Sequence, residues 1–247
     1  MTEKEATCLP AGRVCAIIPA FNEEKTVGDV ILAIRQQAPE VDVVVMNDGS
    51  HDATSKVAAS HGATVLDLPI NLGIGGAVQT GLKHAQRHGY DVAVEIDADG
   101  QHGPQHLSQL VQALAEHQAD LVIGSRFVAS TDYRSSVMRR FGIHTFSYLI
   151  KRMSGKRIYD STSGFRAYGG AAITYFSQNY PADFPEPESI VMALAKGMKI
   201  VEVPVEMHER QAGESVVRRD VSLKALYFVV SNAIAIVMTR ARKGASV

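Results

Sequence analysis

Two aspartates separated by a single residue, Asp97 and Asp99, follow directly after an apolar stretch of the chain. Carboxylates this close repel one another unless a proton or a cation lies between them, and oxygen ligands suit Mg²⁺ or Mn²⁺. A divalent ion held there can in turn bind a diphosphate. The alternative is purely structural, with the two aspartates capping the turn and the helix that follow.

A second polar group, Asn47 and Asp48, comes where another apolar run ends. Both side chains can hydrogen-bond a nucleobase or a ribose, and Gly49 permits a tight turn. A plain connection between a strand and a helix would account for residues 49–54, with Ser50 or Asp52 as the cap. It accounts less well for Asn47 and Asp48.

Two further stretches add candidates for nucleotide binding. Phe21 can lie against a base and Glu23 can accept hydrogen bonds from a ribose or base, whereas Glu24 suits the start of a helix. Residues 71–77 are rich in glycine, as a dinucleotide fingerprint would be. These glycines follow the third predicted strand instead of the first and lack the full spacing, so the signal is weak.

Short apolar runs that alternate with segments of helical period must position these groups. Strands are expected at residues 14–18, 41–46, 63–68, 91–96, 120–123 and 199–207, with Pro19 ending the first. Helices are expected from residue 27 to a close near Pro39, and at 53–60, 77–85 and 107–114. This alternation predicts an α/β fold with a single open, mostly parallel sheet flanked by helices, which binds ligands at the carboxyl ends of its strands.

Residues 127–187 follow a looser pattern, which we interpret as the part that shapes the substrate site. It contains helical character around 141–153, a glycine-rich segment at 164–170 and a segment rich in proline and acids at 181–188. No internal repeat or low-complexity tract is found.

Composition excludes several classes of protein. The 247 residues are 46% hydrophobic and carry a formal net charge of -1, so we expect a folded chain and no nucleic-acid partner. Cys8 and Cys15 do not predict a disulfide framework or a zinc site, and the polar N-terminus does not resemble a secretory signal. We therefore expect the protein in the cytoplasm.

Residues 225–238 are almost entirely apolar and have arginine and lysine on both sides. Fourteen helical residues reach about 21 Å, which is short of the roughly 30 Å hydrocarbon core of a bilayer. The segment therefore predicts a helix that lies on a membrane surface, or a terminal helix that is buried or forms an oligomer contact.

Short motifs spread along the chain, taken in their order, resemble family 2 glycosyltransferases of the GT-A fold, in the branch similar to dolichyl-phosphate-mannose synthases. The resemblance covers residues 14–215. The motifs that carry it are Ile18-Pro19-Ala20-Phe21-Asn22-Glu23, Asn47-Asp48-Gly49-Ser50-His51-Asp52, Asn71-Leu72-Gly73, Asp97-Ala98-Asp99-Gly100-Gln101-His102, Gly124-Ser125-Arg126, Asp160-Ser161-Thr162-Ser163-Gly164-Phe165-Arg166 and Arg210-Gln211-Ala212-Gly213-Glu214-Ser215.

The resemblance implies an enzyme that uses a nucleotide-sugar donor, a UDP-sugar in preference to a GDP-sugar, and a polyprenyl phosphate acceptor. It implies Asp99 and Arg126 as catalytic residues and Mg²⁺ or Mn²⁺ held by Asp97, Asp99 and Gln101. The residues it places at the donor are Pro19, Ala20, Phe21, Glu23, Asp48, Gly73, Asp97 and Ala98. Those it places at the acceptor phosphate are Arg126, Arg140 and Arg210, because a guanidinium can engage two phosphate oxygens at once.

Three features depart from the family pattern. Asn47 stands where relatives often have an acid, which leaves uridine or guanosine open, and Val216 stands where many have lysine. The long C-terminal membrane spans of some relatives have no counterpart, so contact with a membrane must come from the terminal helix or a small membrane-protein partner.

We accordingly expect an inverting, metal-dependent hexosyltransferase that serves the synthesis of cell-surface glycans such as cell-wall polysaccharide. We expect it in the cytoplasm or peripheral on the cytoplasmic membrane face, with a homo-oligomer as a further option. A lipid phosphate attacks the anomeric carbon without a base; a glycan hydroxyl, the alternative acceptor, needs Asp160, Glu186 or Glu188 as base. An alternative of another class is an inactive nucleotide-sugar-binding partner of a membrane protein. The expected organisation is a polar tail (1–12), a GT-A domain (13–217) with a nucleotide-sugar half (13–102) and an acceptor half (103–217), and a C-terminal helix (218–247).

Overall fold

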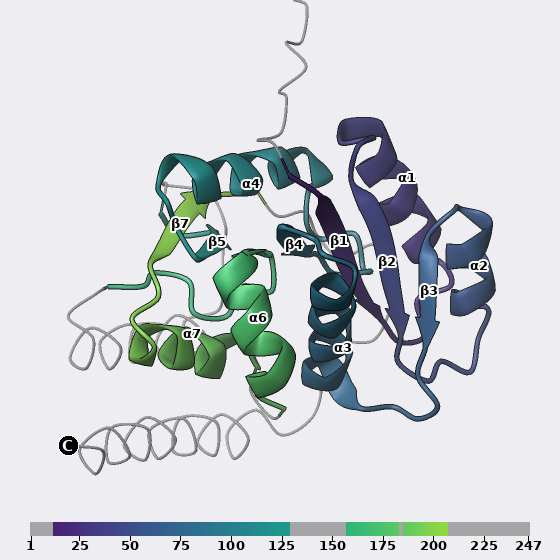
Figure 1. Cartoon of the computed structure of the whole chain (residues 1–247). Coiled ribbons are helices and arrows are strands. Elements are labelled where there is room, and N and C mark those ends of the chain that lie inside the picture. Colours follow the sequence, from purple (N-terminus) through teal and green to yellow (C-terminus); the bar gives the residue numbers. More distant parts are fainter. Residues whose placement is uncertain (1–11, 129–156, 183–184, 207–247) are drawn as a thin grey trace, which may run out of the picture.

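The computed structural model describes residues 12–128, 157–182 and 185–206, which fold around a seven-stranded sheet (Figure 1). The strand order is β3-β2-β1-β4-β6-β5-β7. All strands run parallel except β6, which is antiparallel to both of its neighbours. The strands are β1 (Val14–Ala20), β2 (Asp42–Asn47), β3 (Thr64–Asp67), β4 (Val92–Glu95), β5 (Leu121–Ser125), β6 (Arg166–Gly169) and β7 (Ile200–Pro204).

Helices cover both faces of this sheet. The helices are α1 (Val27–Gln37), α2 (Thr54–Ser60), α3 (Gly73–Arg87), the short 3₁₀ helix η1 (Pro104–His106), α4 (Leu107–Glu116), α6 (Gly170–Asn179) and α7 (Pro185–Ala195). Helices α1, α2 and α4 share one core with Ala16 and Ile18, and α3, α6 and α7 share the other with Cys15 and Ile17. Successive residues of β1 therefore point to opposite cores, and the whole strand is buried.

The predicted single, mostly parallel sheet is confirmed, with one error at its first strand. Pro19 does not end β1, which continues to Ala20. The pairing of β1 with β4 stops at Ile17, so β2 is the only strand that pairs at Pro19. The missing N–H of proline is tolerated where one side of a strand has no ladder partner.

The glycine-rich segment at 164–170 contains a strand that the sequence pattern did not reveal. Residues Arg166–Gly169 form β6, which lies between β4 and β5 and so joins the strands of residues 14–95 to β5 and β7 in one sheet. Helix α6 was likewise not predicted. Helix α7 begins at Pro185, so Glu186 and Glu188 lie in its first turn, where proline and acids are favourable.

The glycines of α3 serve close packing. A Cβ on Gly75 would stand 2.4 Å from the carbonyl oxygen of Pro181, and one on Gly81 would stand 2.9 Å from Cε of Met46. These contacts account for the glycines at 75 and 81 without a dinucleotide.

Among the described residues, none of the helices could span a membrane. The predicted helices at 141–153 and 218–247 lie outside the described residues.

Candidate functional site

The carboxyl ends of the parallel strands bring the predicted site residues to one edge of the sheet. Ala20 is in register with Asn47, and Ile17 is in register with Glu95. The segments that follow β1, β2, β4 and β5 therefore emerge together, and in Figure 1 the arrows of β1, β2 and β3 point toward this edge. Because β6 is antiparallel, residues 157–165 reach the same edge before it.

Asp48 connects the ends of two of these strands with the segment that follows β3. Its backbone N–H donates to the carbonyl of Ala20 at 2.8 Å, and its Oδ1 accepts the N–H of Leu72 at 2.7 Å. Gly49 has φ +70° and lies so close to the backbone of Asn71 that a Cβ would stand 2.9 Å from its nitrogen. Asp48 thus holds the segment that leads into α3 against the ends of β1 and β2.

Asn47 has a structural role that explains its departure from the family pattern. Its Nδ2 donates to Oδ1 of Asp67 at 2.7 Å, and its Oδ1 accepts the N–H of Ser50 at 3.3 Å. An acid at this position would place two carboxylates side by side, which is unfavourable. The amide of Asn47 thus donates one hydrogen bond and accepts one within the protein.

The loop after β1 is hydrogen-bonded to the loop after β2. Asn22, with φ +55°, accepts the N–H of His51 through its Oδ1, and its own N–H donates to Ser50 Oγ. Glu24 accepts the N–H of Ala53 through Oε2, so it caps the start of α2 instead of its own helix. Phe21 stays 43% exposed at this edge, where a base can stack on it.

Glu23 is partly buried beside these loops. Its backbone N–H donates to Thr54 Oγ1, and its carboxylate accepts the hydroxyl of Thr26 at 2.8 Å. Pro19 and Ala20 are buried in β1, and Gly73, at the start of α3, has φ +76° with open space where a Cβ would be.

Asp97 and Asp99 lie in the turn that follows β4. The side chain of Asp97 is 35% exposed, and Asp99 is 8% exposed with its Oδ1 accepting the N–H of Gln101 at 3.0 Å. This contact is the turn cap that the structural interpretation predicts, made through one oxygen. A Cβ on Gly164 would stand 3.4 Å from Oδ1 of Asp97, so glycine there keeps space open beside the carboxylate.

The donor set of this turn fits a hard divalent ion that shares its coordination with a ligand. Asp97, Asp99 and Gln101 supply oxygen atoms of the type that Mg²⁺ and Mn²⁺ prefer. In the described part of the chain, no group of three or more His, Cys, Asp or Glu side chains is arranged to hold a metal by itself. A diphosphate and water would have to complete the coordination, as is usual for Mg²⁺.

His102 is a buried, neutral support for this turn. Its Nδ1 accepts the backbone N–H of Asp97 at 3.2 Å, and its ring stacks on Phe165 at 5.1 Å between centroids. Burial lowers the pKa of His102 to about 4. Although Nδ1 is also 3.5 Å from Oδ2 of Asp97, the imidazole is uncharged at neutral pH and this contact is not an ion pair.

Arg126 and Asp160 form a buried ion pair that the sequence did not predict. Nε donates to Oδ2 and Nη2 to Oδ1, each at 2.6 Å, and Nη2 also donates to Thr162 Oγ1. Burial would raise the pKa of Asp160, but the hydrogen bonds and charge of Arg126 lower it. With both oxygens engaged and a lowered pKa, Asp160 is unsuited as a general base, which corrects that expectation.

A second buried polar cluster lies beneath the turn and was also missed. Glu95 accepts the hydroxyl of Tyr168 at 2.6 Å, and burial raises its pKa to about 8 against the opposing charge of Arg166. Arg166 is fully buried and donates to Ser163 O, Ser189 Oγ and Glu186 O. A glutamate inside the apolar strand β4 was the signal that could have revealed this cluster.

The remaining predicted residues divide into two groups. Glu186 is partly buried at the start of α7, and burial raises its pKa against the charge of Arg166; Glu188 follows one residue beyond Pro187. Ala98 is buried between the two aspartates. Arg140 and Arg210, and the motif that ends at Ser215, lie outside the described residues.

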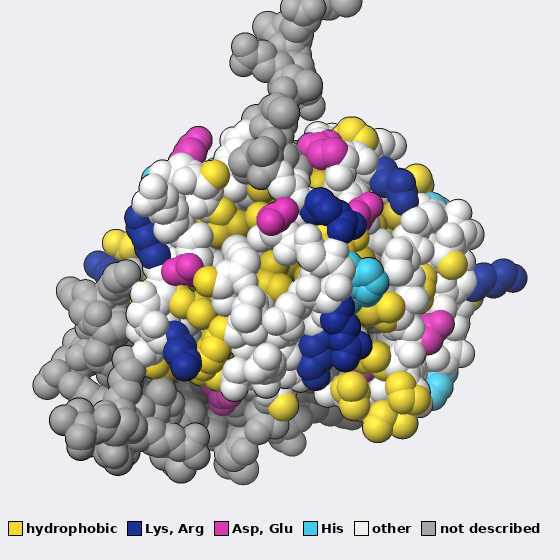
Figure 2. All heavy atoms as spheres, in the orientation of Figure 1, with side chains coloured by type: hydrophobic (Ala, Val, Ile, Leu, Met, Phe, Trp, Pro, Cys, Tyr) yellow, Lys and Arg dark blue, Asp and Glu magenta, His cyan; other side chains and the backbone are white. Residues whose placement is uncertain are grey.

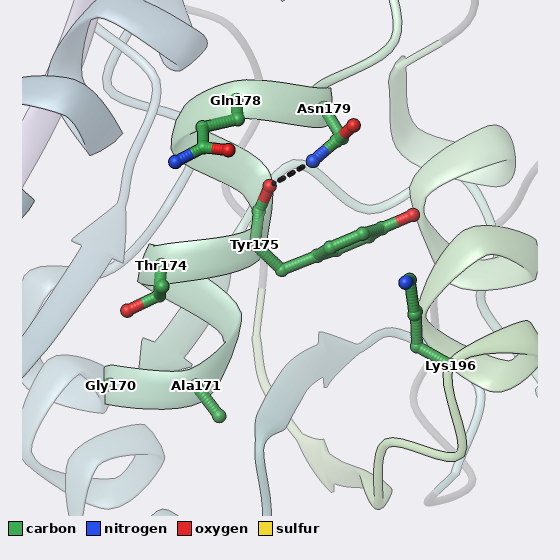
Figure 3. A pocket seen from close by; sticks show the side chains of 7 residues that line it. All are labelled: Gly170, Ala171, Thr174, Tyr175, Gln178, Asn179 and Lys196. Carbon is green, nitrogen blue, oxygen red and sulfur yellow. Dashed lines mark hydrogen bonds between the residues drawn. The ribbon is translucent and has the colours of Figure 1, made fainter.

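An open hollow of about 700 Å³ lies away from this edge, beside α6 (Figure 3). It begins at Gly170, directly after the carboxyl end of the antiparallel β6, and so at the opposite end of the sheet. The ring of Tyr175 points toward Lys196, whose Nζ is 5.1 Å from the ring centroid, while Thr174 and Gln178 point away. These side chains do not converge on a ligand, so we do not place the chemistry there.

The sequence is similar to those of known proteins. Residues 15–175 match the family described as Glycosyl transferase family 2. The chain is 32% identical over 226 residues to a polyprenol monophosphomannose synthase of Mycolicibacterium smegmatis, covering 86% of this chain and 84% of the relative. It is 35% identical over 215 residues to an undecaprenyl-phosphate mannosyltransferase of Micrococcus luteus, covering 82% and 86%.

The fold is also that of solved glycosyltransferase structures. A glucosyl-3-phosphoglycerate synthase of Mycobacterium tuberculosis, crystallised with Mn²⁺, uridine diphosphate and phosphoglyceric acid, has a TM-score of 0.69 at 19% identity. The alignment covers 92% of this chain and 78% of that one. At this identity the likeness establishes the architecture alone.

Proposed function

The chain belongs to glycosyl transferase family 2 and is a glycosyltransferase, and we propose that it moves a hexose from a nucleoside-diphosphate sugar to a polyprenyl phosphate with inversion at the anomeric carbon. The names of the two mannosyltransferase relatives support this acceptor class. We assign the product to the synthesis of cell-surface glycans on the cytoplasmic side of a membrane.

The observation that carries the proposal is the joint position of Asp48, Asp97 and Asp99. The first follows β2 and the others follow β4, with β1 between these strands, so one ligand can reach all of them. Phe21, exposed after β1, would stack on the base, and Pro19, Ala20, Glu23, Asp48 and Gly73 would line the nucleoside. We propose a uridine nucleotide in preference to a guanosine nucleotide, as the resemblance to the family implies.

Asp97, Asp99 and Gln101 would hold Mg²⁺ or Mn²⁺ against the diphosphate, with Ala98 between them. When bound, the ion would neutralise the charge that develops on the departing nucleoside diphosphate. His102 fixes the turn by accepting the N–H of Asp97, and Gly164 leaves room beside its carboxylate. The turn is thus arranged before the donor binds, as electrostatic stabilisation requires.

For the acceptor we propose Arg126, Arg140 and Arg210 as the cationic side chains around the phosphate. The structure describes Arg126, which Asp160 holds in one orientation through two hydrogen bonds. A phosphate monoester is ionised at neutral pH, so its oxygen can attack the anomeric carbon without a strong base. Positioning of the two substrates would then supply most of the rate.

A glycan hydroxyl is a second acceptor to consider, because Glu186 offers a base. Burial raises the pKa of Glu186, and its charge interacts with those of Asp97 and Arg126. A carboxyl with a raised pKa is the kind of group that removes a proton near neutral pH. If Glu186→Gln abolished transfer to a lipid phosphate as completely as transfer to a sugar, the direct attack proposed above would be wrong.

The decisive experiment incubates the purified chain with UDP- and GDP-sugars and a short polyprenyl phosphate, with and without Mn²⁺. We expect metal-dependent transfer to the phosphate, reduced at least about 100-fold in Asp99→Asn because a charge at the leaving group is lost. Asp91→Asn is the matched control, since Asp91 lies exposed at the other end of β4. Binding of the sugar nucleotide without any transfer would instead support an inactive binding partner.

A further inference from the structure

Three exposed apolar side chains follow at every second residue along the connection from β3 into the first turn of α3. Ile70 is 64% exposed, Leu72 47% and Ile74 39%. Figure 2 shows hydrophobic side chains gathered on the surface at the lower ends of β3 and α3, where this segment runs. We call residues 69–74 the apolar loop. A contiguous exposed apolar patch marks an interaction surface more often than single exposed residues do.

The chemistry of the apolar loop suits lipid better than a protein surface. No Asp, Glu, Lys, Arg or His occurs between Asp67 and Lys83, so insertion of this stretch into lipid would move none of its own side-chain charges out of water. Two of its backbone donors are satisfied internally, because Leu72 N–H donates to Asp48 and Gly73 N–H to Asn71 Oδ1. Pairing of this kind lowers the free-energy cost of moving backbone into a medium without water.

The apolar loop is fixed to the substrate edge. Asp48 holds it by the 2.7 Å hydrogen bond to Leu72, and the backbone of Asn71 packs on Gly49. The three apolar side chains therefore stand on the same edge of the sheet as the turn that carries Asp97 and Asp99. A membrane or protein that contacts the apolar loop would therefore lie next to the substrate site as well.

We infer that Ile70, Leu72 and Ile74 dock this edge of the protein on the surface of a lipid bilayer. The inference rests on the proposed function, in which the donor is dissolved in water and the acceptor phosphate lies at the bilayer surface. Docking through the apolar loop places the substrate edge of the protein between the donor in water and the acceptor phosphate at the bilayer surface. Side chains of this size insert into the region between head groups and acyl chains, and binding grows with the apolar area buried there.

The test combines Ile70→Asn with Ile74→Gln in the full-length chain, leaving Leu72 and the site residues unchanged. Sedimentation with phosphatidylcholine vesicles measures docking without any substrate, and we expect the double variant to bind about tenfold more weakly. Turnover is then compared between undecaprenyl phosphate in these vesicles and a short, water-soluble prenyl phosphate. We expect turnover on vesicles to fall about as far as binding, and turnover in solution to stay within about twofold.

Leu32→Gln is the matched control, because Leu32 is 42% exposed on α1, away from the substrate edge, and this variant should resemble the wild type in every assay. Unchanged binding of the double variant to vesicles would overturn the inference and point to a protein or another segment of this chain as the occupant. An equal loss with both acceptors would also overturn it, since the loop would then act within the site. If the wild type transferred sugar to neither acceptor, the proposed function would fail, while the sedimentation result would still decide the docking.

Discussion

At the scale of single residues, the ion pair between Arg126 and Asp160 carries the clearest consequence for stability. Both side chains are almost completely buried, at 3% and 0% exposure. We predict that Asp160→Asn lowers the free energy of unfolding by about 3–5 kcal/mol, because it leaves a buried guanidinium without its counter-charge. Urea unfolding at neutral pH measures this loss.

Asp42→Asn provides the matched control for this prediction. Asp42 pairs with Arg13 at 3.7 Å, but both side chains are more than half exposed, so the change should stay below about 1 kcal/mol. The pKa of Asp160 is lowered, so its contribution is present above the ordinary value of 3.8 and is lost as the pH falls below it. Equal losses from the two variants at pH 7 would contradict a stabilising role of the buried pair.

Glu95 provides a prediction with the opposite dependence on pH. Burial raises its pKa from 4.5 to about 8, so the folded protein keeps a proton that the unfolded chain has already lost. Stability from this group is complete below about pH 4.5 and declines as the pH rises toward 8. Glu95→Gln cannot ionise and can still accept the hydroxyl of Tyr168.

We therefore expect Glu95→Gln to gain stability over the wild type as the pH rises from 5 to 8, by up to about 1.4 kcal/mol per pH unit. Urea midpoints at several pH values measure the difference. Glu116→Gln, at the exposed end of α4, should follow the wild type throughout. Curves for Glu95→Gln and the wild type that stay parallel would show that the buried carboxyl does not hold the extra proton.

At the scale of the elements, the position of α3 depends on glycine where the helix meets the segment before α7. A Cβ on Gly75 would stand 2.4 Å from the backbone oxygen of Pro181 and 2.9 Å from Cα of Ala182. Backbone atoms cannot move aside as a flexible side chain can. We predict that Gly75→Ala lowers the free energy of unfolding by about 1–3 kcal/mol, although alanine favours helix.

Gly170→Ala is the control for this element. Gly170 is the first residue of α6, and the nearest atom to an added Cβ is 4.0 Å away. This variant should be neutral or slightly more stable, because alanine has the higher helix propensity. Thermal unfolding of the two variants distinguishes the cases, and a Gly75→Ala protein as stable as Gly170→Ala would mean that α3 shifts without strain.

Some of the strands and helices could be predicted from the sequence, and others could not. Strands β1, β2, β4 and β5 consist mostly of apolar, buried residues, so their existence was predictable, and the candidate site was predicted at their carboxyl ends. Strand β6 is a run of four residues, Arg-Ala-Tyr-Gly, with a buried arginine at its start. The hydrophobic pattern cannot reveal such a strand, because Arg166 can be buried only by donating hydrogen bonds to residues distant in sequence.

At the scale of the whole molecule, side chains at the ends of strands were predictable as a group, whereas their partners were not. Asp48, Asp97 and Asp99 follow from the rule that parallel sheets bind ligands at their carboxyl edge. Arg126 and Asp160 are 34 residues apart in sequence, and no local spacing connects them. Asp160 was accordingly one of three candidate bases for a glycan hydroxyl, whereas in the structure it is the counter-ion of Arg126.

The mechanism that we propose depends on the turn after β4, which would bind the diphosphate of the donor through a divalent ion. Anomalous diffraction from crystals grown with Mn²⁺ and uridine diphosphate tests it directly. We expect a manganese peak in contact with a carboxylate oxygen of Asp97 or Asp99, bridging to the diphosphate, with the uracil beside Phe21. A nucleotide bound away from this turn, or a manganese peak anywhere else, would contradict the account.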